Sequence, residues 1–125
     1  MQQNKKILVT GANGFIGRHV VTTLSSQGWT VFKGVRVVDG TDIYENVYLD
    51  LSKLESILLL ENTFRFDAIV HIGSSIGFYG QAESELFVEN VLSTGCLAYL
   101  AKQWDARLIF TSAAIIHGAR TSKIK

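Results

Sequence analysis

The feature that most constrains the fold is a glycine-rich turn between an apolar run and an amphipathic run near the N-terminus. The segment from Lys5 to Val20 reads KKILVTGANGFIGRHV, with glycines at positions 11, 14 and 17. The apolar run before the turn predicts a strand, and the apolar spacing after it predicts a helix. Because glycine lacks a Cβ, such a turn leaves the strand tightly and lets backbone amides approach an anion at the helix N-terminus. The pattern therefore predicts a site for the pyrophosphate of a dinucleotide, formed by Gly11, Asn13, Gly14, Phe15, Ile16 and Gly17.

Strand-like and helix-like segments alternate along the rest of the chain. We expect strands at about residues 6–10, 30–37, 46–49, 68–72 and 107–111, and helices at about 14–27, 52–62 and 83–103. The strands AIVHI and LIF are continuously apolar, which is typical of a parallel sheet covered on both faces. With right-handed crossovers, the expected fold is an α/β, Rossmann-like open sheet of about five strands in the order 3-2-1-4-5, with helices on both faces.

Composition narrows the class of protein. The chain has 125 residues, 47% of them hydrophobic, and a formal charge of +1. We expect one domain over residues 1–125 without a substrate domain, and neither nucleic acid nor membrane as a partner. The single cysteine, Cys96, excludes an internal disulfide and suits a reducing cytoplasm. His19, His71 and His117 are scattered, so no metal site is expected.

The motif TGANGFIG resembles the extended branch of the short-chain dehydrogenase/reductase superfamily, whose members are NAD(P)-dependent epimerase/dehydratase-like proteins. Its spacing is Gly-x-x-Gly-x-x-Gly after Thr10, which differs from the Gly-x-Gly-x-x-Gly of many dehydrogenases. The resemblance implies NAD or NADP as the cofactor. A glycine-rich turn without a ligand is the alternative.

The end of the second strand bears on the choice of nucleotide. Aligned on Gly28, the acidic position typical of NAD-selective family members falls on Val35, and Arg36 follows it. An arginine forms bidentate hydrogen bonds with a phosphate, which favours NADP over NAD. Arg18 would add a second positive contact, unless both arginines are merely solvated.

Three further matches extend the resemblance. Asp50 and Leu51 are similar to the family's acidic-apolar pair, in which the carboxylate holds the adenine amino group, although a carboxylate there also favours a helix N-terminus. The fourth strand is similar to one that ends in His-x-Ala-Ala, with Gly73 and Ser74 in place of the alanines, so both are expected beside the cofactor. We interpret His71 as a packed, hydrogen-bonded core residue in preference to a catalytic base.

The third match lies in the long helix. Its segment NVLST, which begins at Asn90, is similar to the family's Asn-Val-x-Gly-Thr and implies a role for Asn90 near the cofactor. An asparagine within a helix is locally unfavourable, which fits a buried hydrogen-bonding role. Apolar residues spread around much of this helix, and such width suggests burial against a partner subunit.

The resemblance breaks where the family's catalytic groups should stand. Counting back from Gly118, Ala113 occupies the position of the family's catalytic serine, and an alanine methyl makes no hydrogen bond. The family also depends on Tyr-x-x-x-Lys, but none of the tyrosines, Tyr44, Tyr48, Tyr79 and Tyr99, has a lysine four residues later. We therefore expect no catalytic residues and no turnover by this chain alone.

The chain corresponds to the cofactor-binding front part of a family member. Ending after the fifth strand would leave an exposed edge and open apolar surface, which predicts a homodimer or other self-association through the long helix or that strand. Three functions stay open: the cofactor half of a nucleotide-sugar epimerase/dehydratase or related reductase, a non-enzymatic nucleotide-binding or interaction module, and a truncated relic. The substrate is not predictable from these residues.

Overall fold

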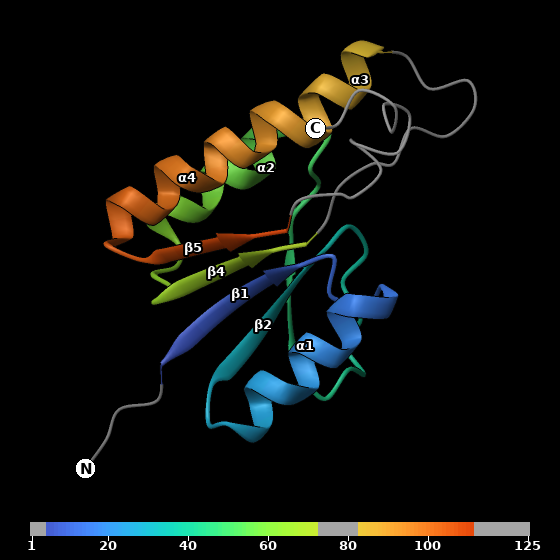
Figure 1. The fold of residues 1–125 in the computed structure, drawn as a ribbon, viewed down its shortest axis with the longest axis vertical. Coiled ribbons are helices and arrows are strands. Elements are labelled where there is room, and N and C mark those ends of the chain that lie inside the picture. The colour runs from blue at the N-terminus through green and yellow to red at the C-terminus, as the bar shows by residue number, and fades with distance from the viewer. Residues whose placement is uncertain (1–4, 73–82, 112–125) are drawn as a thin grey trace, which may run out of the picture.

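The protein is described here by a computed structural model over residues 5–72 and 83–111. In this part of the chain, a five-stranded parallel sheet has the order β3-β2-β1-β4-β5 (Figure 1). The strands are β1 (Lys6–Thr10), β2 (Thr30–Val35), β3 (Glu45–Tyr48), β4 (Ala68–His71) and β5 (Arg107–Phe110). The predicted α/β fold and its strand order are confirmed.

Helices cover both faces of the sheet (Figure 1). On one face lies α1 (Phe15–Ser26); on the other lie α2 (Leu54–Leu58) and α4 (Ser93–Trp104). Two of the predicted helices are divided. A 3₁₀ turn, η1 (Leu59–Asn62), follows α2, and α3 (Glu83–Phe87) continues through a π-helical turn, η2 (Val88–Leu92), into α4.

Alternating residues of the strands supply two cores. In β1, the side chain of Leu8 joins the cluster under α2 and α4, whereas Ile7 and Val9 join the cluster under α1. The ring of Phe66 meets that of Trp104 edge-on, with centroids 5.4 Å apart, which holds the C-terminal end of α4 to the sheet. Because β1 is apolar on both sides, it occupies the centre of the sheet.

The register brings the carboxyl ends of three strands together. Thr10, the last residue of β1, lies beside Gly34 of β2 and His71 of β4. The chain leaves β1 toward β2 on one side, while β4 lies on the other. This is the point at which open α/β sheets form a ligand crevice, so the fold places the glycine turn at its mouth.

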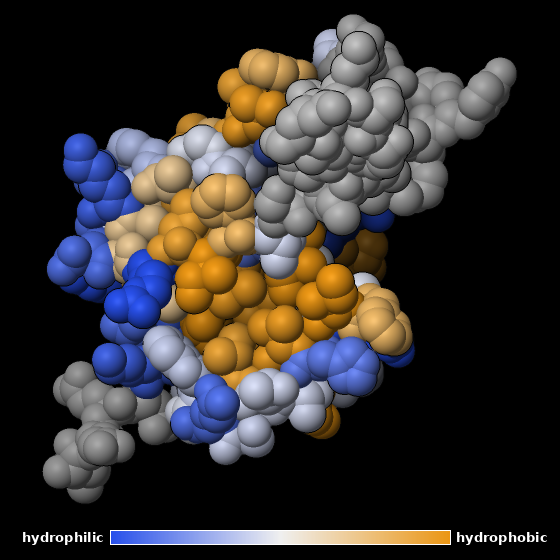
Figure 2. Space-filling model, viewed as in Figure 1, coloured by the Kyte–Doolittle hydropathy of each residue, from blue (hydrophilic) through white to orange (hydrophobic). Residues whose placement is uncertain are grey.

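The edge strand β5 is poorly covered. Ile109 is 49% exposed and Phe110 is 59% exposed, although Leu108 packs against the core under α4. Figure 2 shows apolar residues gathered over the strands between α1 and α4. The exposed fifth strand expected from the sequence is thus present in the described part of the sheet. None of the described helices is long and apolar enough to cross a membrane.

Candidate functional site

The glycine turn is built around the carbonyl of Gly11. Gly11 itself has φ = +65°, in the left-handed region that favours glycine, and its carbonyl accepts the N–H of Gly14 at 3.2 Å. A Cβ added to Gly17 would lie 1.9 Å from that carbonyl oxygen and 2.8 Å from the Cα of Ala12. Helix α1 therefore lies directly against the backbone of the turn, and position 17 has no room for a side chain.

Gly14 has a different environment. Its φ is −76°, which any residue adopts, and an added Cβ would meet only the Gly11 oxygen, at an ordinary contact distance of 3.5 Å. Within the described residues, the protein itself has room for a methyl group here. The expectation that Gly14 lets the backbone approach a phosphate remains a prediction.

The N-terminus of α1 has the features that favour an anion. Gly14 is its N-cap, without a side-chain hydrogen bond to the first turn, and no acidic residue occupies that turn. The first bond within the helix runs from the N–H of Arg18 to the Gly14 carbonyl, at 2.9 Å. The amides before Arg18 belong to the first turn, which has no intrahelical acceptors and carries the positive end of the helix dipole.

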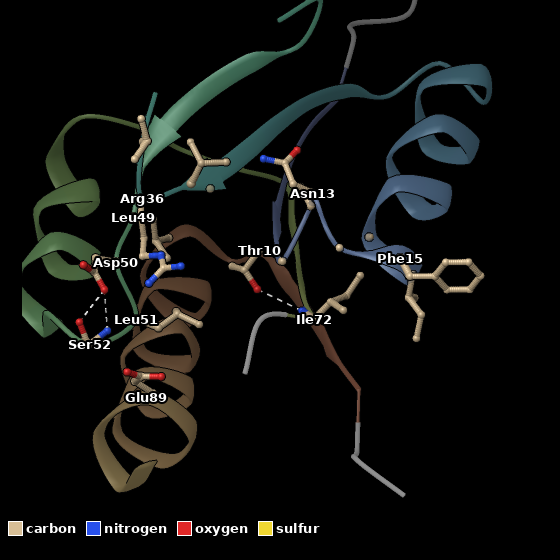
Figure 3. A pocket seen from close by; sticks show the side chains of 18 residues that line it. Thr10, Asn13, Phe15, Arg36, Leu49, Asp50, Leu51, Ser52, Ile72 and Glu89 are labelled. Carbon is tan, nitrogen blue, oxygen red and sulfur yellow. Dashed lines mark hydrogen bonds between the residues drawn. The ribbon is translucent and has the colours of Figure 1, made fainter. Parts of the chain in front are cut away.

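A cleft of about 920 Å³ opens in front of this turn (Figure 3). Its size falls in the range of small-molecule and cofactor sites. The ends of β1 and β2 form one side, the residues after β3 form another, and Ile72 after β4 and Glu89 of η2 close it. The lining residues are Thr10, Gly11, Ala12, Asn13, Gly14, Phe15, Ile16, Gly17, Gly34, Val35, Arg36, Val37, Leu49, Asp50, Leu51, Ser52, Ile72 and Glu89.

Arg36 and Asp50 line the cleft away from the turn (Figure 3). Asp50 Oδ1 accepts hydrogen bonds from Ser52 N–H at 3.0 Å and from Ser52 Oγ–H at 2.6 Å. Burial raises the pKa of Asp50, but these two bonds and the charges of Lys53 and Arg36 outweigh it and lower the pKa below its usual value. Asp50 is therefore ionised near neutral pH. Arg36 is exposed and forms no ion pair with the residues that the structure describes.

The structure brings together most of the residues predicted for the site. The ones that line the cleft are Gly11, Asn13, Gly14, Phe15, Ile16, Gly17, Arg36, Asp50 and Leu51. Asn90 and Arg18 are described but do not line it, whereas Gly73 and Ser74 lie outside the described residues, as does Ala113.

The side chains of Phe15 and Ile16 are 74% and 56% exposed. The Phe15 ring contacts His19 edge-on, with centroids 5.3 Å apart, and points away from Arg36 (Figure 3). Phe15 therefore lines the cleft chiefly with its backbone, in the first turn of α1.

Glu89 is a lining residue that the sequence did not indicate. The wide turn η2 changes the helical period just where Asn90 and Glu89 stand, so regular spacing does not tell which of them faces the cleft. The side chains of Ser93 and Thr94 donate to the carbonyls of Glu89 and Asn90, which satisfies acceptors in this turn. Thr10 and Ile72 could have been predicted as lining residues, because each is the last residue of an expected strand and lies at its carboxyl end.

His71 is held between two threonines beneath the cleft. It is 5% exposed; its Nδ1 lies 2.6 Å from Thr10 Oγ1, and its Nε2 lies 3.1 Å from Thr94 Oγ1. Thr94 Oγ1 donates to the Asn90 carbonyl, so it accepts from Nε2–H, and the neutral ring accepts at Nδ1. Burial lowers the pKa of His71 to about 4. The ring is a packed, hydrogen-bonded core group, as interpreted from the sequence.

Comparison with known proteins agrees with this geometry. The chain is 29% identical to a UDP-glucose 4-epimerase of Pisum sativum, over 92% of this chain and 38% of the relative. It superimposes with a TM-score of 0.74, at 28% identity, on a short-chain dehydrogenase/reductase superfamily protein of Agrobacterium tumefaciens with bound NAD, covering 90% of this chain and 34% of that one. A yeast methylglyoxal/isovaleraldehyde reductase complexed with NADPH shares the fold, with a TM-score of 0.72 at 21% identity over 86% of this chain and 37% of that one.

The chain thus spans well under half the length of these relatives. Over residues 7–125 it matches the NAD dependent epimerase/dehydratase family. The glycine turn, the sheet order and this match over nearly the whole sequence agree, and the chain belongs to that family.

Proposed function

We propose that this chain binds a dinucleotide, with the pyrophosphate at the N-terminus of α1 and the adenosine between Arg36 and Asp50. The observation that carries the proposal is that these three features, contributed by segments far apart in the sequence, line one cleft. The room for a Cβ at Gly14 supports it further. Because the described residues leave room for a side chain there, close approach of a ligand is a reason for the glycine.

The proposed preference is for NADP over NAD. Val35 is buried and apolar where NAD-selective family members carry a carboxylate, and Arg36 beside it lines the cleft. Asp50 is proposed to accept a hydrogen bond from the adenine amino group. Its carboxylate is ionised and anchored through Oδ1 by Ser52, so it is oriented before a ligand arrives.

The chain by itself is proposed to have no dehydrogenase or epimerase turnover. Support comes from the sequence: Ala113 stands at the position of the family's serine, and Tyr-x-x-x-Lys does not occur in the 125 residues. A role as the cofactor half of a nucleotide-sugar epimerase/dehydratase or reductase, and a role as a nucleotide-binding module, both agree with dinucleotide binding. The reducing cytoplasm is the proposed location, on the basis of the single Cys96.

Titration with NADPH and NADH, followed by nicotinamide fluorescence, tests the proposal. We expect saturable binding of both, with NADPH the tighter. Arg36→Ser should weaken NADPH binding roughly tenfold to a hundredfold, because a charged hydrogen-bond pair is lost, and change NADH binding less than about threefold. Arg18→Ser is the matched control: it removes an exposed arginine that does not line the cleft, and should change neither affinity.

Three results would contradict parts of the proposed function. Failure of the wild-type chain to bind either nucleotide overturns the binding function. Equal effects of Arg36→Ser on both nucleotides overturn the NADP preference. Hydride transfer by the isolated chain overturns the proposed lack of turnover.

A further inference from the structure

A lysine of the sheet donates a hydrogen bond to Asn13 in the glycine turn. Lys33 lies in β2 on the face covered by α1, in register with Val9, and its side chain is 12% exposed. Its Nζ donates to Asn13 Oδ1 at 3.1 Å and lies 2.9 Å from Asp42 Oδ2. Lys33 does not line the cleft, whereas Asn13 does. Its ammonium group therefore meets the site only through another residue.

The ammonium group is fully engaged by this arrangement. Besides Asn13 and Asp42, it lies 5.2 Å from the centre of the Tyr44 ring, within the range of a cation–π contact. The hydrogen bond from Lys33, with those from the Asn46 side chain and the Tyr44 backbone, lowers the pKa of Asp42 to about 2. Asp42 thus stays charged and holds the lysine in place over the whole neutral range.

This contact fixes the orientation of the Asn13 amide. An ammonium group has donors and no acceptor, so the atom of Asn13 that faces Lys33 must be the oxygen. The amide nitrogen, with its two donors, then faces away from Lys33. Figure 3 shows that nitrogen on the side of Arg36 and the oxygen on the other side. Without Lys33, the amide of an asparagine in this exposed turn can direct either its oxygen or its nitrogen toward the cleft.

We propose that Lys33 is a positioning residue, which orients the Asn13 amide as a hydrogen-bond donor toward the 2′-phosphate of NADP, on the same side of the cleft as Arg36. This inference rests on the dinucleotide binding proposed above. The preference for NADP then depends on two groups. One is the exposed guanidinium of Arg36, and the other is the Asn13 amide, whose orientation is fixed by Lys33 of β2. Asn13 touches the ligand, and Lys33 acts through Asn13.

A double-mutant cycle tests the positioning role. NADPH and NADH are titrated against the wild-type chain, Lys33→Met, Asn13→Ala and the double variant, with thermal melts to establish that each is folded. Lys33→Met and Asn13→Ala should each weaken NADPH binding roughly tenfold, as expected for a hydrogen bond to a charged group, and NADH binding less than about threefold. The double variant should bind NADPH as Asn13→Ala does, because Lys33 has no effect without its amide partner.

Two further variants sharpen the test. Lys102→Met removes one exposed positive charge from the far end of α4 and should leave both affinities unchanged, which controls for net charge. Asn13→Asp keeps an oxygen for Lys33 but turns a second oxygen toward the cleft. It should weaken NADPH binding at least tenfold, on the order of a lost charged hydrogen bond, and it serves if Lys33→Met does not fold.

The outcomes separate this inference from the function on which it rests. If the wild-type chain binds neither nucleotide, the proposed function fails and the positioning role with it. If the wild-type chain binds NADPH but the losses from Lys33→Met and Asn13→Ala multiply, or both nucleotides weaken equally, or Asn13→Asp binds NADPH normally, only the positioning role is overturned.

Discussion

Gly14 and Gly17 stand three residues apart in the same motif, yet of these two only position 17 requires a glycine within the described part of the chain. At position 17 a Cβ collides with the backbone of the turn, where no side chain can move aside. At position 14 the backbone conformation and the space both accept a methyl group. The two glycines therefore separate a requirement of folding from a proposed requirement of binding.

The corresponding alanine variants should behave differently. Gly17→Ala should destabilise the protein by about 3 kcal/mol or more, because the overlap forces α1 away from the turn. Gly14→Ala should change the free energy of unfolding by less than about 1 kcal/mol, yet weaken NADPH binding tenfold or more, because the methyl group occupies the path of the phosphate. Urea unfolding and NADPH titration of both variants check this. Normal NADPH binding by Gly14→Ala would show that the phosphate does not approach Gly14 closely.

Among the elements, the sheet and α1 were predictable from the sequence and the helix before β5 was only partly so. Continuous apolar strands and the glycine turn gave the strand order, because a parallel sheet with short connections leaves few topologies. The division at η2 was not predictable. No residue in the segment VENVL marks a wide turn, and its Glu89 and Asn90 carbonyls accept from the side chains of Ser93 and Thr94 one turn later. Glu89 was missed for this reason, and Lys33 because a strand position gives no sign of its distant partner.

Three elements are joined through His71. It connects β4 to Thr10 of β1 and to Thr94 of α4, and only the neutral ring satisfies both bonds with its two nitrogens in different roles. Since burial lowers its pKa to about 4 in the folded state from 6.5, the unfolded chain binds the proton more readily. The free energy of unfolding that depends on a neutral His71 is therefore fully present above pH 6.5 and is lost as the pH falls toward 4.

This linkage predicts a pH dependence of unfolding. Between pH 6.5 and 4 the wild-type chain should lose about 3 kcal/mol of stability through this group, and a His71→Gln variant should lose correspondingly less over the same range. His19→Gln, which removes an exposed histidine, should keep the wild-type slope. Urea unfolding at several pH values measures both. A slope in His71→Gln equal to that of the wild type would show that the histidine does not carry the effect.

For the whole molecule, exposed apolar surface is expected to drive self-association. A groove of about 690 Å³ between α2 and the helix η2–α4 is lined by Leu54, Leu58, Glu61, Val91, Leu92, Gly95, Cys96 and Tyr99. Leu58, Val91 and Tyr99 are each more than two-fifths exposed. Among the described residues, the edge strand β5 is another exposed apolar surface. We propose a homodimer through the helical groove, since a groove offers more complementary apolar area than one short strand.

Charge substitutions distinguish the two surfaces. Val91→Glu should shift a dimer to monomer, because a carboxylate would be buried in an apolar contact, whereas Ile109→Lys on β5 should leave the dimer intact. Sedimentation equilibrium of the wild type and both variants gives the answer. A wild-type chain that stays monomeric at high concentration contradicts self-association, and dissociation by Ile109→Lys alone would place the interface on β5.

The cleft at the carboxyl ends of the strands is proposed to bind a dinucleotide. An NMR titration of the ¹⁵N-labelled chain with NADPH tests it most directly, since it reports binding and location together. We predict saturable shifts concentrated on the amides of the turn around Gly14, on Arg36 and on the Asp50 segment, with little change in the groove between α2 and α4. An unchanged spectrum, or shifts confined to that groove, would mean that the cleft does not bind NADPH.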